Sequence, residues 1–354
     1  MLQNIKYLPA EWAEQEFVQI IFPHQQTDWA YMLDEVCICF LKIIENILQF
    51  ENVLVVCADT ESVQKVESIK SKNNFKLLIF NAQSNDTWSR DTSAITIFEN
   101  GKKIALDFTF NGWGLKFSAN LDNQITDKIF QKQKAKNKEQ EQETTIDYQI
   151  SNIDYKDCRN FVLEGGSIES DGNGTILTTE KCLLSENRNY LSRIEIEKKL
   201  KFYLGAKRVL WLKNGALAGD DTDSHIDTLA RFCNDTTIAY ISCTDEQDEH
   251  FAELKAMETE LKAFRTFEGQ PYSLVPLPMA DKVIFDGERL PATYANFLII
   301  NGAILLPTYN SPKDKITAEI LQKVFPDRKI IEINCLPLIK QHGSLHCVTM
   351  QFPK

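Results

Sequence analysis

The chain has 354 residues, of which 43% are hydrophobic and 25% are charged. This composition is typical of a folded protein that can bury a substantial core. The formal net charge of −11 argues against nucleic acid or an anionic membrane as a partner, because both require basic patches. The charge suits a cationic ligand, although many acidic proteins bind none.

Cysteine usage and the first residues of the chain indicate the cellular compartment. Nine cysteines are scattered without a Cys-x-x-Cys pair, which indicates reduced thiols rather than a disulfide framework. The start of the chain lacks the apolar core of a signal peptide, and no apolar run reaches the roughly 18 residues of a membrane-spanning helix. We therefore expect a cytoplasmic protein. The sequence is compatible with a homo-oligomer and does not specify the oligomeric state.

The predicted elements alternate between helices and strands. Apolar residues at helical spacing predict a helix over residues 29–50, and a buried strand at 52–57 precedes a helix capped by Asp59. Further strands are predicted at 75–80, 94–98, 103–108, 175–178, 208–212, 237–242, 297–300 and 303–307. Further helices are predicted at 192–204, 248–264 and 317–324. This order indicates an α/β fold.

Residues 124–157 stand apart from this alternation. Residues 131–143 are almost entirely Lys, Glu, Gln and Asn, a composition typical of a solvated helix or an excursion from the fold. We interpret 124–157 as a charged insertion in a single domain that covers residues 1–354.

The segment Trp88-Ser89-Arg90-Asp91 follows a predicted strand and a polar turn. Asp91 at such a strand end can point into a cleft, and Trp88 can stack on a planar cation. The alternative is an Arg90–Asp91 pair on the surface beside a core tryptophan.

Two glycine-containing turns follow. Glycines on both sides of Trp113 allow the backbone to bend sharply and present the indole, or simply to form a packed loop. Glu164 precedes a Gly-Gly turn that lacks the phosphate-binding patterns GxGxxG and Gly-Lys-Ser/Thr. Glu164 is therefore either a buried partner that orients a catalytic base or a plain turn residue.

Residues 219–227 form the densest group of titratable side chains, namely Asp220, Asp221, Asp223, His225 and Asp227. Four carboxylates this close repel one another unless a metal ion or a guanidinium joins them. The spacing does not match a calcium loop, and a zinc site requires more His or Cys close by. The alternative is a solvated acidic loop.

Cys347 lies between a glycine-bearing turn and an apolar alternation. A thiol in that position is either a small buried hydrophobe or a nucleophile. His346 is a poor partner, because neighbouring side chains of a strand face opposite ways. His225, reached through the fold, is the better candidate base.

Taken in order, these segments resemble the agmatine deiminase branch of the guanidino-group-modifying enzymes. The resemblance runs from Glu11-Trp12 and residues 22–24 to the end of the chain and is carried by five ordered motifs: residues 88–91, 110–114, 163–167, 220–227 and 346–347. It implies a pentein-type α/β propeller, with five pseudo-symmetric ββαβ modules around a polar channel, and neither metal nor cofactor. The sequence departs from the usual family pattern at Ser93-Ala94, at Thr228 and at residues 341–344, and the last of these bears on the pocket for the far end of the substrate.

The resemblance implies a covalent mechanism on a small cationic guanidino substrate. Cys347 attacks the guanidinium carbon as a thiolate, His225 protonates the departing ammonia, and the same histidine activates the water that resolves a thiouronium intermediate. Glu164 is expected to orient His225. The resemblance implies agmatine as the substrate, with N-carbamoylputrescine and ammonia as the products.

Binding roles follow from the charge of the substrate. Asp91 and Asp227 are expected to hold the guanidinium N–H groups, with Trp88 beside them. Trp113, Asp220 and Asp221 suit the ammonium at the far end. Like charge disfavours a thiolate here, so we expect Cys347 to alkylate slowly near neutral pH in the free enzyme, or to be protected chiefly by protonated His225.

Three alternatives stay open. The same chemistry on free or C-terminal peptidyl arginine requires Arg90 or Arg188 to reach the substrate carboxylate. A protein that binds cationic amines without turnover is the second. A metal-dependent hydrolase is the third and would use Asp220, Asp221, His225 and Asp227.

Overall fold

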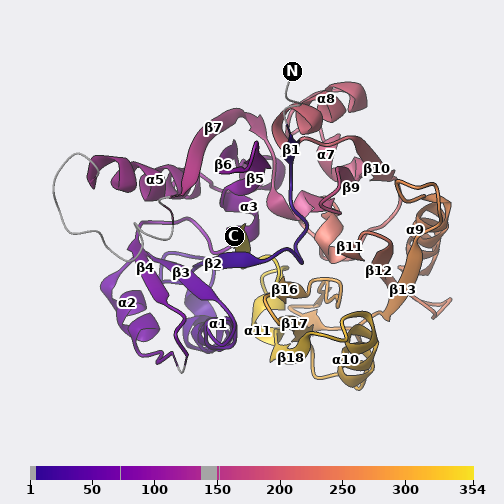
Figure 1. The fold of residues 1–354 in the computed structure, drawn as a ribbon. Coiled ribbons are helices and arrows are strands. Elements are labelled where there is room, and N and C mark those ends of the chain that lie inside the picture. Colours follow the sequence, from indigo (N-terminus) through magenta and orange to yellow (C-terminus); the bar gives the residue numbers. More distant parts are fainter. Residues whose placement is uncertain (1–4, 72, 137–149, 151) are drawn as a thin grey trace.

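The computed structural model describes residues 5–71, 73–136, 150 and 152–354. The fold is α/β, with helices between most of the strands (Figure 1). No helix in these ranges has both the length and the apolar character that crossing a bilayer requires.

Four of the sheets in the described residues repeat one local pattern. An antiparallel hairpin is followed by a crossover to a third strand, which pairs in parallel with the second strand of the hairpin. The strands are β5 (Ile95–Glu99), β6 (Lys102–Thr109) and β7 (Ile153–Val162); β8 (Ile168–Ser170), β9 (Thr175–Thr179) and β10 (Arg208–Leu212); β11 (Ala230–Asn234), β12 (Thr237–Ser242) and β13 (Ser273–Pro278); β16 (Leu298–Ile300), β17 (Ala303–Thr308) and β18 (Lys329–Asn334). A parallel pair cannot be joined by a tight turn, so a helix makes each crossover.

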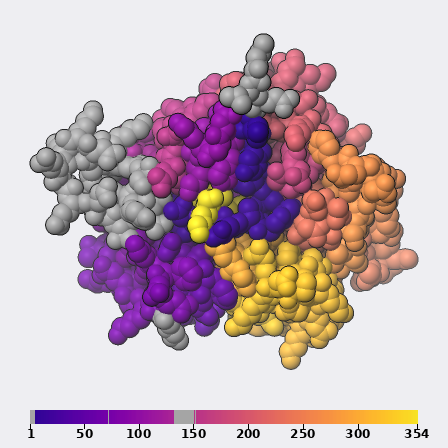
Figure 2. Space-filling view, viewed as in Figure 1, coloured from indigo at the N-terminus to yellow at the C-terminus, as the bar shows by residue number. Residues whose placement is uncertain are grey.

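The fifth sheet joins segments from opposite ends of the chain. Its strands are β19 (Met350–Pro353), β2 (Gln15–Ile21), β3 (Asn52–Cys57) and β4 (Leu77–Asn81). β19 is antiparallel to β2, with Met350 opposite Gln19. The short strand β1 (Lys6–Tyr7) pairs with β5 of the neighbouring sheet. Figure 2 shows the segment near the N-terminus (indigo) meeting the C-terminal residues (yellow) in the middle of this face.

The longer helices make the crossovers and cover the sheets. They are α1 (Leu33–Ile47), α2 (Thr60–Glu67), α5 (Ile125–Lys136), α8 (Arg193–Leu204), α9 (Phe251–Ala263) and α10 (Lys313–Val324). Short helical turns carry polar groups at strand ends: η1 (Ala30–Met32), α3 (Ser89–Thr92), α4 (Gly112–Leu115), η2 (Asp122–Gln124), η3 (Gly165–Ser167), α7 (Glu180–Leu183), η4 (Ile226–Thr228) and α11 (Leu336–Ile339). A two-stranded hairpin of β14 (Ile284–Phe285) and β15 (Glu288–Arg289) lies between β13 and β16.

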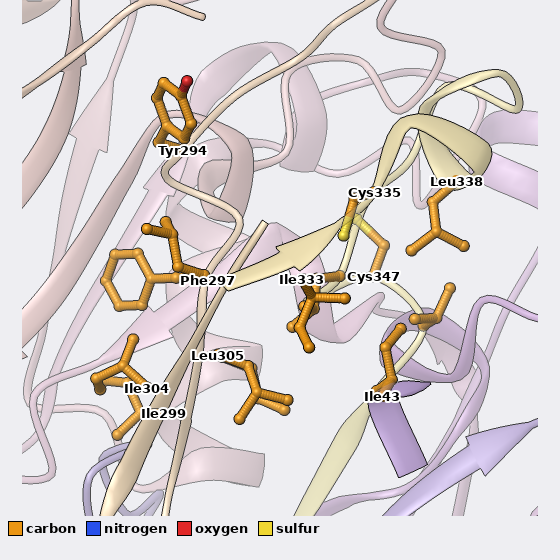
Figure 3. Close-up of a cluster of buried hydrophobic side chains, with 14 of the residues drawn as sticks. Ile43, Tyr294, Phe297, Ile299, Ile304, Leu305, Ile333, Cys335, Leu338 and Cys347 are labelled. Carbon is orange, nitrogen blue, oxygen red and sulfur yellow. The ribbon is translucent and has the colours of Figure 1, made fainter. Parts of the chain in front are cut away.

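The apolar core forms where helices pack on sheets. Figure 3 shows one part, in which Ile43 of α1 and Leu338 of α11 face Ile333 of β18 and Leu305 of β17. Cys347 lies in the same view and belongs to this cluster. A side chain packed into such a core has little freedom to move.

Several predicted elements are confirmed. The strands at 52–57, 208–212 and 237–242 are β3, β10 and β12 with the same bounds. Asp59 caps α2, since its Oδ1 accepts a hydrogen bond from the Ser62 N–H at 2.7 Å. The helix predicted from residue 29 starts as α1 at Leu33, after the 3₁₀ turn η1.

Residues 124–157 contain part of the regular fold. α5 makes the crossover from β6 towards β7, and it buries Ile125, Ile129 and Phe130 in the second apolar cluster. β7 begins at Ile153. Residues 137–149 and 151 lie outside the described ranges.

Candidate active site

Three polar side chains from two loop segments converge on one backbone position. A Cβ added at Gly166 would lie 2.7 Å from Nδ1 of His225, 2.9 Å from Oδ1 of Asp91 and 3.1 Å from Oδ2 of Asp227. Sγ of Cys347 lies 3.9 Å from the same Asp227 oxygen. Any side chain at residue 166 would therefore displace this group, and the Gly-Gly turn predicted only as a local bend is what allows the group to assemble.

Asp91 has both oxygens occupied. Oδ1 accepts a hydrogen bond from the Gly166 N–H at 2.9 Å, and Oδ2 accepts one from Nε1 of Trp113 at 3.0 Å. Burial raises the pKa of Asp91 and the nearby Asp227 adds to the rise, while His225 opposes it. The short helical turn α3 buries Arg90 and Asp91, so they are not the surface pair considered as an alternative.

Asp227 has one oxygen occupied and one open. Oδ2 accepts a hydrogen bond from Nδ1 of His346 at 2.7 Å, whereas the fully buried Oδ1 has no hydrogen-bond partner among the described residues. Burial works to raise the pKa of Asp227, but His346 and His225 outweigh it and lower this pKa. Asp227 is thus an ionised carboxylate with an unused acceptor, a combination that suits a cation with N–H donors.

His225 is buried at the N-cap of η4. Its Nδ1 lies 3.7 Å from Oδ1 of Asp91, and its Nε2 has no hydrogen-bond partner among the described residues. Burial opposes a charge on the imidazole, but Asp91, Cys182 and Glu164 outweigh it and raise the pKa of His225 well above its usual value. This direction favours the protonated imidazole, the form that a general acid requires.

Cys347 is a buried thiol in a turn before β19. Its Sγ lies 3.4 Å from Oδ1 of Asn296, which also accepts a hydrogen bond from the His346 N–H at 2.9 Å. Burial raises the pKa of Cys347 well above its usual value, and Asp227 and Asp91 raise it further. This agrees with the expectation that like charge disfavours the thiolate.

Glu164 pairs with an arginine. Both of its carboxylate oxygens lie 3.0 Å from Nε of Arg188. The same guanidinium donates to Oδ2 of Asp223 at 2.6 Å and to the Thr222 carbonyl at 2.8 Å. A carboxylate oxygen of Glu164, Sγ of Cys182 and a ring nitrogen of His225 lie within 4.8 Å of one another, so Glu164 faces the histidine while it binds Arg188.

The acidic loop is joined by cations of the protein itself. Arg188 and Lys116 both contact Asp223, and Nζ of Lys116 also donates to the Asp221 carbonyl at 2.7 Å. Asp220 accepts from the backbone N–H groups of Thr222 and Ser224 at 3.1 and 2.6 Å. Its carboxylate is therefore committed to the turn itself.

Asp221 differs from Asp220, because no hydrogen bond from another residue to its carboxylate is found in the described part of the chain. Burial and the neighbouring Asp220 raise the pKa of Asp221 to about 6, while His342 and Lys116 lower it. Nδ1 of His342 lies 2.7 Å from the Gly219 carbonyl, which ties this loop to residues 341–344.

Two tryptophans wall the site. Trp88 lies between Trp29 and Trp113, with ring centroids 5.7 and 6.5 Å away, and only 5% of its surface is exposed. A Cβ at Gly343 would come within 2.1 Å of the Trp88 ring. Trp113, Asp223 and His342 adopt left-handed backbone angles although none is a glycine. Such strain collects where the backbone must present a side chain to a site.

Two of the clusters that offer metal-ligating atoms border the site. They are Glu164 with Cys182 and His225, and Glu11 with Glu169 and His346. In each cluster the carboxylates already form ion pairs with an arginine. Glu164 pairs with Arg188 in the first cluster, and Glu11 and Glu169 pair with Arg231 in the second. A metal ion would have to compete with these guanidinium groups for the carboxylates.

Two features of the site could not be predicted from the sequence: the contact of Asn296 with Cys347, and the turn in which His346 lies. Asn296 precedes β16 in a segment without a polar motif, so only the fold brings it to Cys347. His346 was set aside on the assumption of a strand. Residues 345–348 form a turn, in which the Thr349 N–H donates to the His346 carbonyl at 3.1 Å. Strand alternation therefore does not apply, and His346 and Cys347 both contact Oδ2 of Asp227.

Comparison with known proteins agrees with this geometry. The profile of the Porphyromonas-type peptidyl-arginine deiminase family matches residues 7–353. An agmatine deiminase of Stutzerimonas stutzeri is 32% identical over 375 residues, covering 99% of this chain and 96% of that protein.

Two solved structures are similar over their whole length. A chain from Porphyromonas gingivalis, described as a candidate arginine deiminase, is 49% identical, has a TM-score of 0.89 and covers 99% of both chains. A C. jejuni agmatine deiminase with substrate bound is 38% identical, with a TM-score of 0.88 and coverage of 100% of this chain and 98% of that chain.

Proposed function

Because the chain belongs to the Porphyromonas-type peptidyl-arginine deiminase family, we propose that it hydrolyses agmatine to N-carbamoylputrescine and ammonia. The observation that carries the proposal is the convergence of Asp91, Asp227 and His225 on Gly166, with Cys347 against Asp227. Two carboxylates, a thiol and a protonated imidazole are the groups that attack on a guanidinium carbon requires.

The first half of the reaction removes ammonia. The substrate guanidinium donates to the open Oδ1 of Asp227 and lies against Asp91, and its positive charge favours loss of the Cys347 thiol proton. The thiol proton passes to solvent, and the thiolate attacks the central carbon and forms a tetrahedral adduct. His225 then donates its proton to one nitrogen, the C–N bond breaks, and ammonia leaves a covalent thiouronium species.

The second half returns the enzyme to its starting state. His225, now neutral, takes a proton from a water molecule that attacks the thiouronium carbon. The C–S bond breaks, the ureido product leaves and Cys347 is free again. We assign Glu164 to holding the Arg188 and His225 side of the site in place.

Charge at the mouth supports agmatine over arginine. Arg188 is used by Glu164 and Asp223, and Arg90 donates to the His346 carbonyl and lies 4.0 Å from Glu11. The Arg188 guanidinium is thus committed to other groups of the protein, and Nη2 of Arg90, which has no hydrogen-bond partner among the described residues, is buried beside Glu11. Asp221 has an open carboxylate at the mouth, so we assign it to the substrate ammonium together with Trp113, with Asp220 holding the turn.

Deimination of arginine is the second candidate, favoured by the identity of 49% with the P. gingivalis chain. It requires a cation at the mouth. Lys116 is the described residue placed to supply one, but its Nζ already lies 2.7 Å from Oδ1 of Asp223.

We also propose that residues 1–354 form one catalytic domain, with the five sheets as the blades of a propeller. The hairpin with a parallel third strand, repeated in four sheets, supports this arrangement. The pairing of β19 with β2 also supports it, because it places the last strand of the chain in one sheet with β2, β3 and β4. We assign the protein to the cytoplasm, and its nine free cysteines support a reducing compartment.

The deciding experiment measures ammonia release from agmatine and from arginine, with EDTA present, for the wild type and for Cys347→Ala. We expect turnover of agmatine only, and its loss in the variant. Turnover of arginine would make arginine the substrate, and activity in Cys347→Ala or inhibition by EDTA would refute the thiol mechanism. Agmatine binding by calorimetry without ammonia release would indicate a binding protein.

A further inference from the structure

A chain of buried charged and polar side chains leads from Asp227 through His346 to Glu11. Oε2 of Glu11 lies 2.7 Å from Nη2 of Arg231 and 2.7 Å from Nε2 of His346. Nδ1 of His346 lies 2.7 Å from Oδ2 of Asp227. Arg231 also pairs with Glu169, and all five side chains are at least nine-tenths buried. We call Glu169, Arg231, Glu11 and His346 the axial cluster.

Each ring nitrogen of His346 faces a carboxylate oxygen at 2.7 Å: Nδ1 faces that of Asp227 and Nε2 faces that of Glu11. Arg231 and His346 lower the pKa of Glu11 against the effect of burial, and His346 lowers that of Asp227. His346 therefore bridges two buried carboxylates.

The other charged and titratable groups around His346 fit this assignment. Arg90 donates to the His346 carbonyl, and its Nη2 lies 4.0 Å from Oε2 of Glu11. Glu169 adds negative charge on the Arg231 side, and the thiol of Cys347 follows on the chain. A cavity of about 60 Å³ borders Glu11, Arg90, Glu169 and His346, which gives the cluster a route to solvent that does not pass Cys347.

We propose that His346 is a positioning residue for deimination: it acts through Asp227, by fixing Oδ2 and turning the open Oδ1 towards the substrate guanidinium. The inference rests on the function proposed above. One oxygen of Asp227 is taken by Nδ1 of His346, and the other has no partner in the described part of the chain. Without His346 both oxygens would be free to rotate, and burial would favour the protonated acid.

The experiment compares His346→Gln with His250→Gln. His250 is a matched control, because it is also buried, lies 2.8 Å from the carboxylate of Asp248 and accepts a hydrogen bond from the Ala218 N–H. The values of kcat and KM for agmatine are measured from pH 5 to pH 9 for both variants and the wild type.

For His346→Gln we expect KM at pH 7 to rise about 10- to 100-fold, the range for losing a hydrogen bond to a charged group, with a smaller change in kcat. The sign of the pH effect follows from Asp227. Its lowered pKa rises when the hydrogen bond from His346 is lost, so guanidinium binding disappears at a higher pH and the acid limb of kcat/KM moves up. His250→Gln should leave the shape of the profile unchanged.

A uniform loss of activity at every pH in His346→Gln, or a shift equal to that of His250→Gln, would overturn the inference. Where His346→Gln does not fold, Glu11→Gln is the second variant. Glu11→Gln keeps an acceptor for His346 but removes the negative charge. The acid limb of the kcat/KM profile should therefore move to higher pH, by less than in His346→Gln, and an unchanged acid limb would again overturn the inference.

Agmatine affinity of Cys347→Ala, with and without His346→Gln, separates this inference from the proposed function. A wild type that binds agmatine but releases no ammonia would refute deimination. A pH-dependent loss of affinity in the double variant would still support the role of His346.

Discussion

The two sides of Asp227 handle buried charge in opposite ways. On the axial side every charge is paired: His346 with Glu11 and Asp227, and Arg231 with Glu11 and Glu169. By contrast, two polar atoms of the candidate site, Oδ1 of Asp227 and Nε2 of His225, have no partner among the described residues. Unpaired buried polar atoms cost free energy, so the axial side is built for stability and the other side for a ligand.

The largest effect should come from the one carboxylate that spans both sides. Asp227→Asn can keep its oxygen towards His346 and place its NH₂ at the open Oδ1 position, so the chain should still fold. The substrate cation then meets a neutral donor, and kcat/KM for agmatine should fall roughly 10²- to 10³-fold. Steady-state kinetics test this.

Asp91→Asn is the contrasting variant. Both oxygens of Asp91 accept hydrogen bonds, from Gly166 and Trp113, so an asparagine must set its NH₂ against an N–H. We expect an additional loss of about 1–3 kcal/mol in the free energy of unfolding, measured with urea. Equal stability of the two asparagine variants would contradict the comparison.

Breaking the axial side should affect stability directly. Arg231→Met leaves Glu11 and Glu169 buried without their guanidinium, and we expect a loss of about 3–5 kcal/mol in the free energy of unfolding. The matched control is Arg193→Met, whose pairs with Glu180 and Glu197 are exposed and should be worth about 1 kcal/mol or less. Similar losses in the two variants would show that the axial cluster carries no special stability.

The open side can be probed by alkylation of Cys347. Its pKa is raised well above the usual value, so the thiolate fraction grows with pH throughout the neutral range. Inactivation by iodoacetamide should accelerate about tenfold for each pH unit, roughly 100-fold from pH 6 to pH 8. A fast rate that does not depend on pH down to 6 would show a thiolate already present in the free enzyme.

The smallest effect is expected at the mouth. His342 has a φ of 65°, and its ring holds the Gly219 carbonyl. His342→Gly relieves the backbone strain but frees the loop that carries Asp221, so KM for agmatine should rise roughly 2- to 10-fold, with a smaller change in kcat. An unchanged KM would show that His342 does not contribute to binding the far end of the substrate.

The candidate site was predictable where its groups stand in short motifs. Asp91, His225, Asp227 and Cys347 were named from the sequence, and the structure brings them together. Partners set by the tertiary fold were not predictable. Asn296 carries no local signal, and Glu11 and Arg231 are 220 positions apart.

The fold shows the same division. Helices and strands with a clear period were found close to their bounds. The short strands β8 and β19 depend on pairing partners rather than on their own pattern. In particular, neither segment alone carries a sequence signal that predicts the pairing of β19 with β2.

That pairing also sets the order in which the enzyme can become active during folding. Met350 must find Gln19 across almost the whole sequence, and contacts of such separation form slowly because a long loop must close first. Cys347 precedes β19 by three positions, so the nucleophile reaches Asp227 only when this last strand is in place. Refolding chains should regain helical circular dichroism before they regain turnover, and intermediates that lack β19 carry every other catalytic group yet no attacking sulfur.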